Sequence, residues 1–223
     1  MLRLVTIASV PVILILAYVY HRDKYNKEPW WLLLFSFVGG ALTVPPIIWW
    51  ETAMLDIMPA VETVNQDALY VSFLVAGLCE ETSKLIILLL VVYRSTHFNE
   101  KIDGIVYAVF VSLGFALVEN IMYVVSGGQE VGLMRAITAV PAHAIFAIAM
   151  GFHLAKAKFS ARKRYRHFAL ALLVPIILHG TYNYILMSES NYLLLTFVLY
   201  LFLLYRLGFK RMRFSIRNSA YRK

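Results

Sequence analysis

The sequence predicts an all-α protein, a polytopic membrane bundle of about seven transmembrane helices. Of its 223 residues, 61% are hydrophobic and only 15% are charged, whereas soluble domains carry about 25% charged residues. The apolar residues gather into runs that can cross a hydrocarbon core, for which about 20 residues are needed. Little sequence is left between these runs, so we expect one membrane-embedded domain over residues 1–223.

Each expected span is an apolar run that is bounded by polar connectors. In chain order the runs are Leu2–Tyr20, Trp30–Trp50, Ala68–Tyr93, Ile102–Val125, Met134–Ala155, Phe168–Met187 and Tyr192–Leu207, the shortest. The first run is expected to remain as an anchor, because no small-residue signal-peptide cleavage site follows it. Pro45 and Pro46 fall within the second run and should kink it, because proline removes a helical hydrogen bond. Pro141 and Pro175 fall within the fifth and sixth runs.

The charge of the connectors predicts the orientation. Eighteen of the 21 Lys and Arg residues lie in alternate connectors, which are His21–Pro29, Arg94–Lys101, Lys156–His167 and the tail from Arg206. The other connectors, Glu51–Asp67, Ser126–Leu133 and Ser188–Asn191, hold none. Basic loops stay in the cytoplasm, so we expect an outside N-terminus and a cytoplasmic C-terminus. The basic stretches lack a nucleic-acid-binding module, so no nucleic-acid partner is expected.

Polar residues, most of them ionisable, interrupt four of the expected spans. A charge at the bilayer centre costs several kcal/mol, so each such residue needs a partner or a function. They are Glu80, Glu81 and Lys84 in the third span, Glu119 and Asn120 in the fourth, His143 and His153 in the fifth, and His179 and Asn183 in the sixth.

Depth and spacing group most of these residues together. At 1.5 Å per residue from the predicted outer ends, Glu80 lies about 18 Å deep, His143 about 14 Å and His179 about 12 Å. Glu119 lies about 9 Å deep and Asn183 about 6 Å, whereas His153 falls near the cytoplasmic end. Residues four apart share a helix face, as do Glu80 with Lys84 and His179 with Asn183. Glu80 and Glu81 point about 100° apart, so one can face the site while the other pairs with Lys84.

This set predicts a polar cavity within the membrane that is capable of hydrolysis. A buried carboxylate can exchange a proton with a bound water, and imidazoles can stabilise an oxyanion. Two histidines with Glu80 or Glu81 are also a ligand set for hydrolytic zinc, although HExxH is absent. Both the metal-dependent and the metal-free arrangement stay open. The single cysteine, Cys79, is expected to be inert packing and not a nucleophile.

Four motifs in order resemble the PrsW family of membrane-embedded proteases and, more distantly, the superfamily of CAAX-processing glutamate proteases. EExxK falls on Glu80, Glu81 and Lys84, and FxxxEN on Phe115, Glu119 and Asn120. A third motif's histidine falls on His143, and HxxxN on His179 and Asn183. The wider superfamily usually has His at the position of Glu119. The likeness runs from HRDKYNKEPW to HGTYNYIL.

The resemblance implies an endopeptidase of the bacterial plasma membrane. Its substrate would be a membrane-anchored anti-sigma factor or another single-span protein, which receives its first cut on the extracytoplasmic side. It implies that Glu80 or Glu81 activates water and that His143 and His179 stabilise the oxyanion or hold a metal, with zinc as the candidate. Asn183 would orient His179 or the substrate carbonyl, while Glu119 and Asn120 complete the polar wall.

Two other classes use similar residues. Buried Glu and His chains also serve proton-coupled transporters and channels, which would need a polar path on to the cytoplasmic side, where only His153 is available. A non-enzymatic receptor or scaffold could use a hydrogen-bonded core of the same composition.

Overall fold

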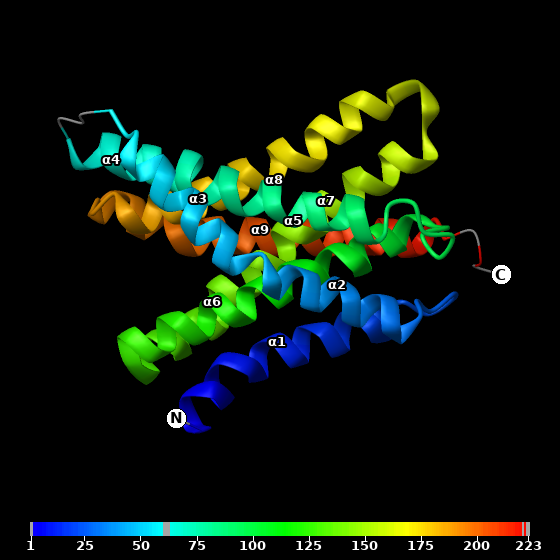
Figure 1. The fold of residues 1–223 in the computed structure, drawn as a ribbon, viewed down its shortest axis with the longest axis horizontal. Coiled ribbons are helices and arrows are strands. Elements are labelled where there is room, and N and C mark those ends of the chain that lie inside the picture. Colours follow the sequence, from blue (N-terminus) through cyan, green and yellow to red (C-terminus); the bar gives the residue numbers. More distant parts are fainter. Residues whose placement is uncertain (1, 60–62, 220, 222–223) are drawn as a thin grey trace.

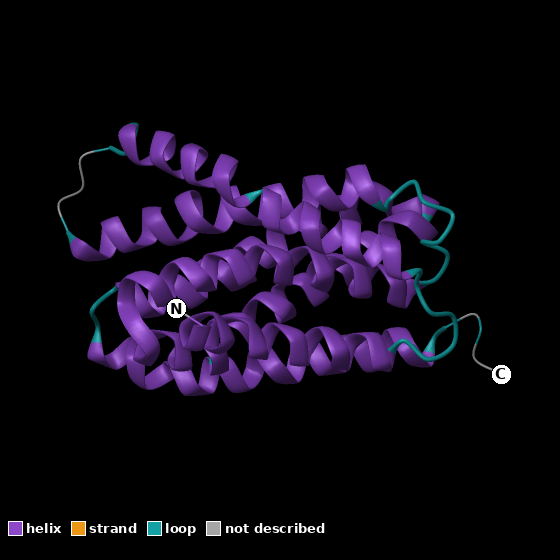
Figure 2. Ribbon diagram, turned by 60° about the horizontal axis from the view of Figure 1, so that its bottom comes forward, coloured by secondary structure: helices purple, strands orange, loops and turns teal. Residues whose placement is uncertain are grey.

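A computed structural model describes residues 2–59, 63–219 and 221. All regular secondary structure in these residues is helical (Figures 1 and 2). The helices are α1 (Leu2–Arg22), α2 (Trp30–Leu42), α3 (Val44–Asp56), α4 (Val64–Tyr70), the π-helix η1 (Val71–Leu78), α5 (Cys79–Val91), α6 (Lys101–Ile137), α7 (Ala139–Phe159), the 3₁₀ turn η2 (Ala161–Lys163), α8 (Arg164–Met187) and α9 (Asn191–Arg217).

The helices confirm the predicted all-α membrane class. Five helical stretches in the described residues are long and apolar enough to cross a membrane, namely Arg3–Arg22, Trp30–Asp56, Lys101–Phe159, Ala161–Met187 and Asn191–Arg217. Most of the expected third span lies on α4, η1 and α5, a stretch that carries Glu80, Glu81 and Lys84.

The expected kink in the second span lies at Thr43, between α2 and α3, where the backbone keeps helical angles (φ −74°, ψ −18°). α2 ends at Leu42, and Pro45 and Pro46 occupy the first turn of α3, where a missing N–H costs no intrahelical bond. The Thr43 hydroxyl donates to the Gly40 carbonyl oxygen at 2.6 Å and covers part of the exposed backbone. α3 then continues to Asp56, six residues beyond the expected end of the span.

The long α6 reverses direction at Gly128. This residue has φ 79° and ψ −172°, a conformation that glycine adopts without the Cβ clash of other residues. Residues that lie about equally far before and after Gly128 contact one another. Ser112 Oγ donates to the His143 carbonyl at 3.0 Å, and a Cβ on Gly132 would meet Val124. The arm that leads to Gly128 and the arm that follows it into α7 are therefore antiparallel.

Close glycine contacts hold α2, α6 and α7 together. A Cβ on Gly40 would lie 1.9 Å from the Val111 carbonyl oxygen, and one on Gly151 would lie 2.0 Å from the Gly104 carbonyl oxygen. Small residues let membrane helices approach until backbones touch, which replaces the hydrophobic effect as a source of packing energy. α6 thereby becomes the buried centre of the bundle.

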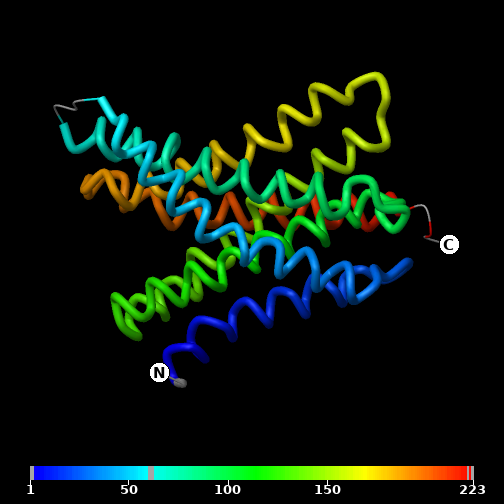
Figure 3. The backbone as a smooth tube through the Cα atoms, in the orientation of Figure 1, coloured from blue at the N-terminus to red at the C-terminus, as the bar shows by residue number. Residues whose placement is uncertain are grey.

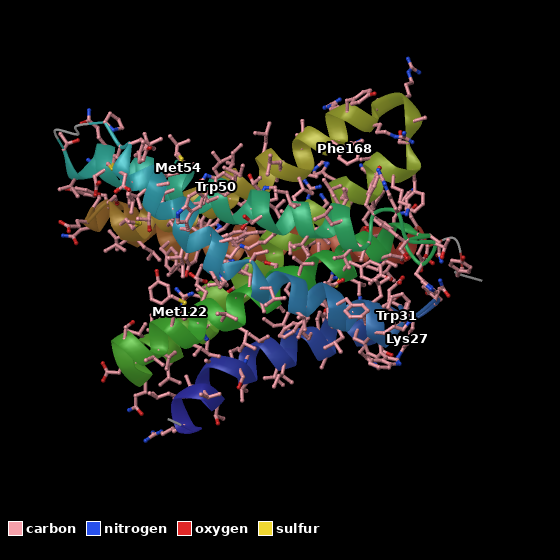
Figure 4. The ribbon with its side chains drawn as sticks, in the orientation of Figure 1. Lys27, Trp31, Trp50, Met54, Met122 and Phe168 are labelled. Atoms are coloured by element: carbon pink, nitrogen blue, oxygen red, sulfur yellow. The ribbon has the colours of Figure 1, made fainter. Side chains whose placement is uncertain are left out.

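Connectors alternate between the two ends of the bundle, and the chain termini lie toward opposite ends (Figures 1 and 3). The connectors after α1, α5 and α7 lie toward the end that holds the C-terminus. The basic segments predicted there, His21–Pro29, Arg94–Lys101 and Lys156–His167, hold 11 of the 21 Lys and Arg residues. Lys27 and Trp31 are labelled at this end in Figure 4. Trp31 is 41% exposed, as expected for an aromatic side chain at a membrane interface.

Two buried carboxylates, Asp23 and Glu28, hold the connector between α1 and α2 in place at this same end. The Tyr107 hydroxyl donates to Glu28 Oε2, and the Glu28 backbone N–H donates to Asp23 Oδ2 at 3.3 Å. Burial raises the pKa of Glu28 to about 9, and the neighbouring Asp103 carboxylate adds to the rise. Burial likewise raises the pKa of Asp23 to about 6. Both residues lie between α1 and α2, outside the spanning helices.

Candidate active site

The paired glutamates enter the bundle on the first turn of α5, directly after the π-helix η1. π turns are rare and frequently occur at functional sites. Lys84 Nζ lies 3.0 Å from Glu80 Oε2 and 2.7 Å from Glu81 Oε1. Lys84 and Glu81 are 1% and 0% exposed. The ammonium is thus shared between the two carboxylates, and not held by one of them as expected.

His179 on α8 contacts this pair from a neighbouring helix. Its Nδ1 lies 2.9 Å from Glu81 Oε1 and 3.8 Å from Glu80 Oε2. A carboxylate only accepts hydrogen bonds, so Nδ1 carries the proton and donates to Glu81. The ring stacks on Phe146, with centroids 5.0 Å apart and planes at 20°. Glu81 and Phe146 together fix the orientation of the His179 ring.

His143 on α7 connects Lys84 to a second ion pair. Its Nδ1 lies 3.3 Å from Lys84 Nζ, and its Nε2 lies 3.0 Å from Glu119 Oε2. Because an ammonium only donates and a carboxylate only accepts, these partners assign the tautomer with the proton on Nε2. Arg135 Nη2 lies 2.8 Å from the same Glu119 oxygen. The His143 and His179 ring centroids are 5.1 Å apart.

These side chains face a cavity of about 990 Å³ that α3, η1, α5, α6, α7 and α8 surround. Five of the predicted site residues line it, namely Glu80, Glu119, His143, His179 and Asn183. Glu81 and Lys84 lie behind Glu80, in the wall and not on its surface. In Figure 4, the lining residue Met122 is labelled on α6, and Trp50 and Met54 on α3.

Asn120 lies outside the cavity, although the sequence placed it in the polar wall. Its amide nitrogen donates to the Ala8 carbonyl oxygen at 3.1 Å, and its Oδ1 accepts from Arg135 Nε at 3.0 Å. Asn120 therefore ties α1 to the arm of α6 that carries Arg135. Its effect on the site is indirect, through the Arg135–Glu119 pair.

Three charged residues that line the cavity, Arg135, Glu51 and Glu130, were not among the predicted site residues. Arg135 lies within the expected fifth span, and its charge inside an apolar run was the signal that could have found it. Glu51 was expected in a connector, but α3 extends past it and places it in the cavity wall. Whether Glu51 lies in a connector or in the cavity wall depends only on where α3 ends.

The two residues set aside from the sequence also lie apart from the cavity. His153 Nδ1 lies 3.2 Å from His167 Nδ1, and the two rings stack at 29°. Cys79 is fully buried, and its thiol donates to the Leu74 carbonyl oxygen at 3.7 Å. Neither residue lines the cavity.

Four residues of the cluster fit a divalent metal ion by donor type and spacing. Glu80, Glu81, His143 and His179 each offer a ligand atom, and these atoms all lie within 4.8 Å of one another. Two imidazoles with carboxylates form a known set for hydrolytic zinc, with bonds of about 2 Å, so small side-chain movements would close the donors around one ion. Lys84 Nζ contacts three of the four residues, and a bound ion would replace these contacts.

The fold and this cluster define a class: a multi-pass helical membrane protein with a hydrolytic Glu/His site inside the bundle. Residues 28–207 match the PrsW family of intramembrane metalloproteases. Three relatives are each called Protease PrsW. That of Bacillus subtilis strain 168 is 41% identical over 204 residues, covering 90% of this chain and 91% of its own.

The other two relatives cover still more of the chain. The protein of Clostridioides difficile strain 630 is 35% identical and covers 98% of this chain and 93% of its own. That of Oceanobacillus iheyensis is 38% identical and covers 93% and 95%. No solved structure matches the chain. The chain therefore belongs to the PrsW family, and it is an intramembrane protease that hydrolyses peptide bonds.

Proposed function

We propose that this protease makes the first, extracytoplasmic-side cut in a membrane-anchored anti-sigma factor or a similar single-span regulatory protein of the bacterial plasma membrane. The observation that carries the proposal is the convergence of Glu80, His143 and His179 on one cavity within the bundle. The backbone of a single-span substrate already lies within the membrane. It can therefore reach a cavity inside the bundle without leaving the bilayer.

The orientation follows from the connectors. With the basic connectors in the cytoplasm, seven spans place the N-terminus outside and the C-terminus inside. The alternation of connectors between the two ends of the bundle supports this count (Figure 3). The cavity includes Ser126 and Glu130 beside the reversal at Gly128, which this orientation puts at the outer face. An opening there suits a cut on the extracytoplasmic side.

Glu80 is the better candidate for the general base, because it lines the cavity while Glu81 lies behind it. Its carboxylate would take a proton from water as the water oxygen attacks the scissile carbonyl carbon. The proton would then pass from Glu80 to the amide nitrogen as the C–N bond breaks. Lys84 holds the Glu80 carboxylate in place through its 3.0 Å contact.

The developing oxyanion needs preorganised donors, and two lining residues can supply them. The bond to Glu81 occupies His179 Nδ1, so a protonated His179 ring would have its Nε2–H free to donate to the oxyanion. The Asn183 amide, one turn further along α8, can donate to the same oxygen. Zinc, held by Glu80, Glu81, His143 and His179, would add Lewis-acid polarisation of the carbonyl.

The transporter alternative would require a polar path beyond the cavity. His153 was the candidate for that path, but it contacts His167 and does not line the cavity. Buried apolar side chains, Ala147 and Met150, occupy the turns of α7 between His143 and His153. The arrangement therefore favours a closed reaction site over conduction.

Co-expression with a tagged, membrane-anchored anti-sigma factor tests this function. We expect the protease to release the extracytoplasmic tag, with mass spectrometry placing the cut on the outer side of the substrate span. Glu80→Gln should abolish release while the protein still accumulates in the membrane. His153→Gln is the matched control, a histidine outside the cavity, and should retain cleavage. A cut on the cytoplasmic side, or release by Glu80→Gln, would contradict the proposal.

A further inference from the structure

Glu51 is a cavity residue that the proposed chemistry does not use. It lies on α3 among apolar side chains that face the same cavity, namely Val44, Ile47, Ile48 and Leu55. Ile47, Glu51 and Leu55 are four residues apart and so share one face of the helix. α3 thus presents an apolar wall to the substrate with a single carboxylate in it.

The deeper charges of the cavity have partners, whereas Glu51 has none among the described residues. Glu80 contacts Lys84, and Glu119 contacts Arg135 and His143. No ion pair or hydrogen bond joins Glu51 to another described residue, and its strongest charge interactions are repulsions from Glu80 and Glu119. A carboxylate at an apolar, partly water-excluded wall is costly unless a cation or donor compensates it.

We propose that Glu51 is a specificity-determining residue that binds a cationic side chain, lysine or arginine, of the substrate near the scissile bond. The inference rests on the proposed proteolysis. The Lys and Arg side chains of the site are already engaged, Lys84 by Glu80 and Glu81 and Arg135 by Glu119. A cationic substrate side chain in the part of the cavity that α3 lines would therefore find Glu51 as its free partner.

The charge of Glu51 should select against acidic substrates as well as for basic ones. Like-charge juxtaposition inside an interface is penalised strongly, and such repulsion is a common source of specificity. A role for Glu51 in the chemical step would predict something different, because its loss would then slow all substrates alike. Substrate preference separates these two roles.

The test uses a library of single-span reporter proteins in which the extracytoplasmic residues next to the span are randomised. Each reporter carries a tag that cleavage releases, and sequencing of cleaved members gives the preference at each position. The protease variants are wild type, Glu51→Gln and Glu51→Lys, with Glu80→Gln as the background for host proteases. Asp56→Asn is the matched control, an exposed carboxylate five residues further along α3, outside the cavity.

Wild type and Asp56→Asn should both enrich Lys or Arg at one position near the cut, by about tenfold, which corresponds to one partly desolvated ion pair. Glu51→Gln should lose the enrichment, with a larger fall in cleavage of basic members than of neutral ones, while Glu51→Lys should favour Asp or Glu. Unchanged preference in Glu51→Gln, or an equal loss on all members, would overturn the inference while proteolysis stands. No release by wild type above the Glu80→Gln background would instead refute the proposed proteolysis.

Discussion

Arg135 Nη2 lies 2.8 Å from Glu119 Oε2, although 16 residues separate them on one helix. A straight helix would hold residues at this spacing about 24 Å apart. Because α6 folds back on itself at Gly128, Arg135 comes to lie beside Glu119, and one helix supplies both members of the ion pair. Because Glu119 also accepts from His143 Nε2, the pair fixes a histidine of the cavity.

Arg135→Gln should therefore reduce cleavage by about 10–100-fold, the usual effect of losing a residue that orients a site ligand. Without the guanidinium, the Glu119 carboxylate loses its charge partner and no longer holds His143 in one position. The measurement is kcat for the single variants and for Arg135→Gln combined with Glu119→Gln. We expect the double variant to lose less than the product of the two single losses. Arg162→Gln, at an exposed position, is the control and should leave kcat unchanged. If the losses of the Arg135 and Glu119 variants multiply fully in the double variant, the two residues act separately.

Glu80→Gln and Glu81→Gln should both stop cleavage but differ in stability. Loss of the general base at Glu80 is expected to cost about 10²–10⁴-fold in rate. The melting temperature of Glu80→Gln should fall less than that of Glu81→Gln, because Lys84 and His179 keep Glu81 as their closer partner. Glu81→Gln removes the shared partner of Lys84 and His179 at full burial, and breaking such a pair costs about 3–5 kcal/mol. Thermal unfolding in detergent alongside cleavage separates the two. Equal melting temperatures would contradict the division of roles.

Gly40→Ala should destabilise the bundle far more than Gly39→Ala. A methyl group at Gly40 would lie 1.9 Å from the backbone carbonyl oxygen of Val111, so α2 and α6 must separate. At Gly39 the methyl would meet only a methyl group of the Ile87 side chain, at 2.9 Å. We expect a loss of about 3 kcal/mol or more for Gly40→Ala, beyond ordinary overpacking. Similar unfolding curves for the two variants would refute the close contact.

Stability should fall as pH rises, because Glu28 and Asp23 are buried at the basic end. The pKa of Glu28 is raised from 4.5 to about 9 and that of Asp23 from 3.8 to about 6. The folded protein therefore holds these protons more tightly than the unfolded chain. This stabilisation is complete below about pH 4 and is lost through about pH 6 for Asp23 and pH 9 for Glu28.

The measurement is the melting temperature in detergent between pH 5 and pH 9. Each kcal/mol lost should lower it by about 2–4 °C. Glu28→Gln keeps a hydrogen-bonding side chain without a titrating proton, so its profile should be flatter across this range. Glu130→Gln, at an exposed position, is the control and should follow the wild-type profile. A Glu28→Gln profile as steep as that of wild type would contradict the assignment.

Removal of metal tests the role of the four-residue ligand set. If zinc serves cleavage, the purified protein should hold about one ion per chain, and a chelator should abolish cleavage until zinc is restored. His143→Ala should then lower the bound zinc, whereas His153→Ala, outside the ligand set, should not. Full cleavage by metal-free protein would assign the reaction to Glu80, His179 and Asn183 alone.

Much of the architecture and the core of the site could be predicted from the sequence. Membrane helices must be long and apolar, so composition alone predicts their class, and a charge within them is conspicuous. The structure confirms that Glu80, His143 and His179 converge, as the depth argument expected. Their catalytic roles stay predictions until the variants are assayed.

The features that escaped prediction depend on exact geometry. Asn120 was expected in the polar wall because it completes the FxxxEN motif with Glu119. Adjacent residues on a helix point about 100° apart, however, and Asn120 reaches α1 instead. Glu51 depended on where α3 ends. The π-helix η1 had no recognisable pattern, since the residues Val71–Leu78 are as apolar as any ordinary span.

That π-helix makes chain length, and not only composition, a requirement for activity. A π turn closes its hydrogen bonds over five residues and not four, so the segment Val71–Leu78 sets the rotation at which Cys79 and the acidic pair enter the bundle. Deleting one residue there, with the rest of the segment still in π geometry, would turn the following helix by roughly a quarter of a turn, and Glu80 would swing out of the cavity wall. Such a chain would retain every motif and still have no aligned base, so alignments of relatives should show few gaps across this segment.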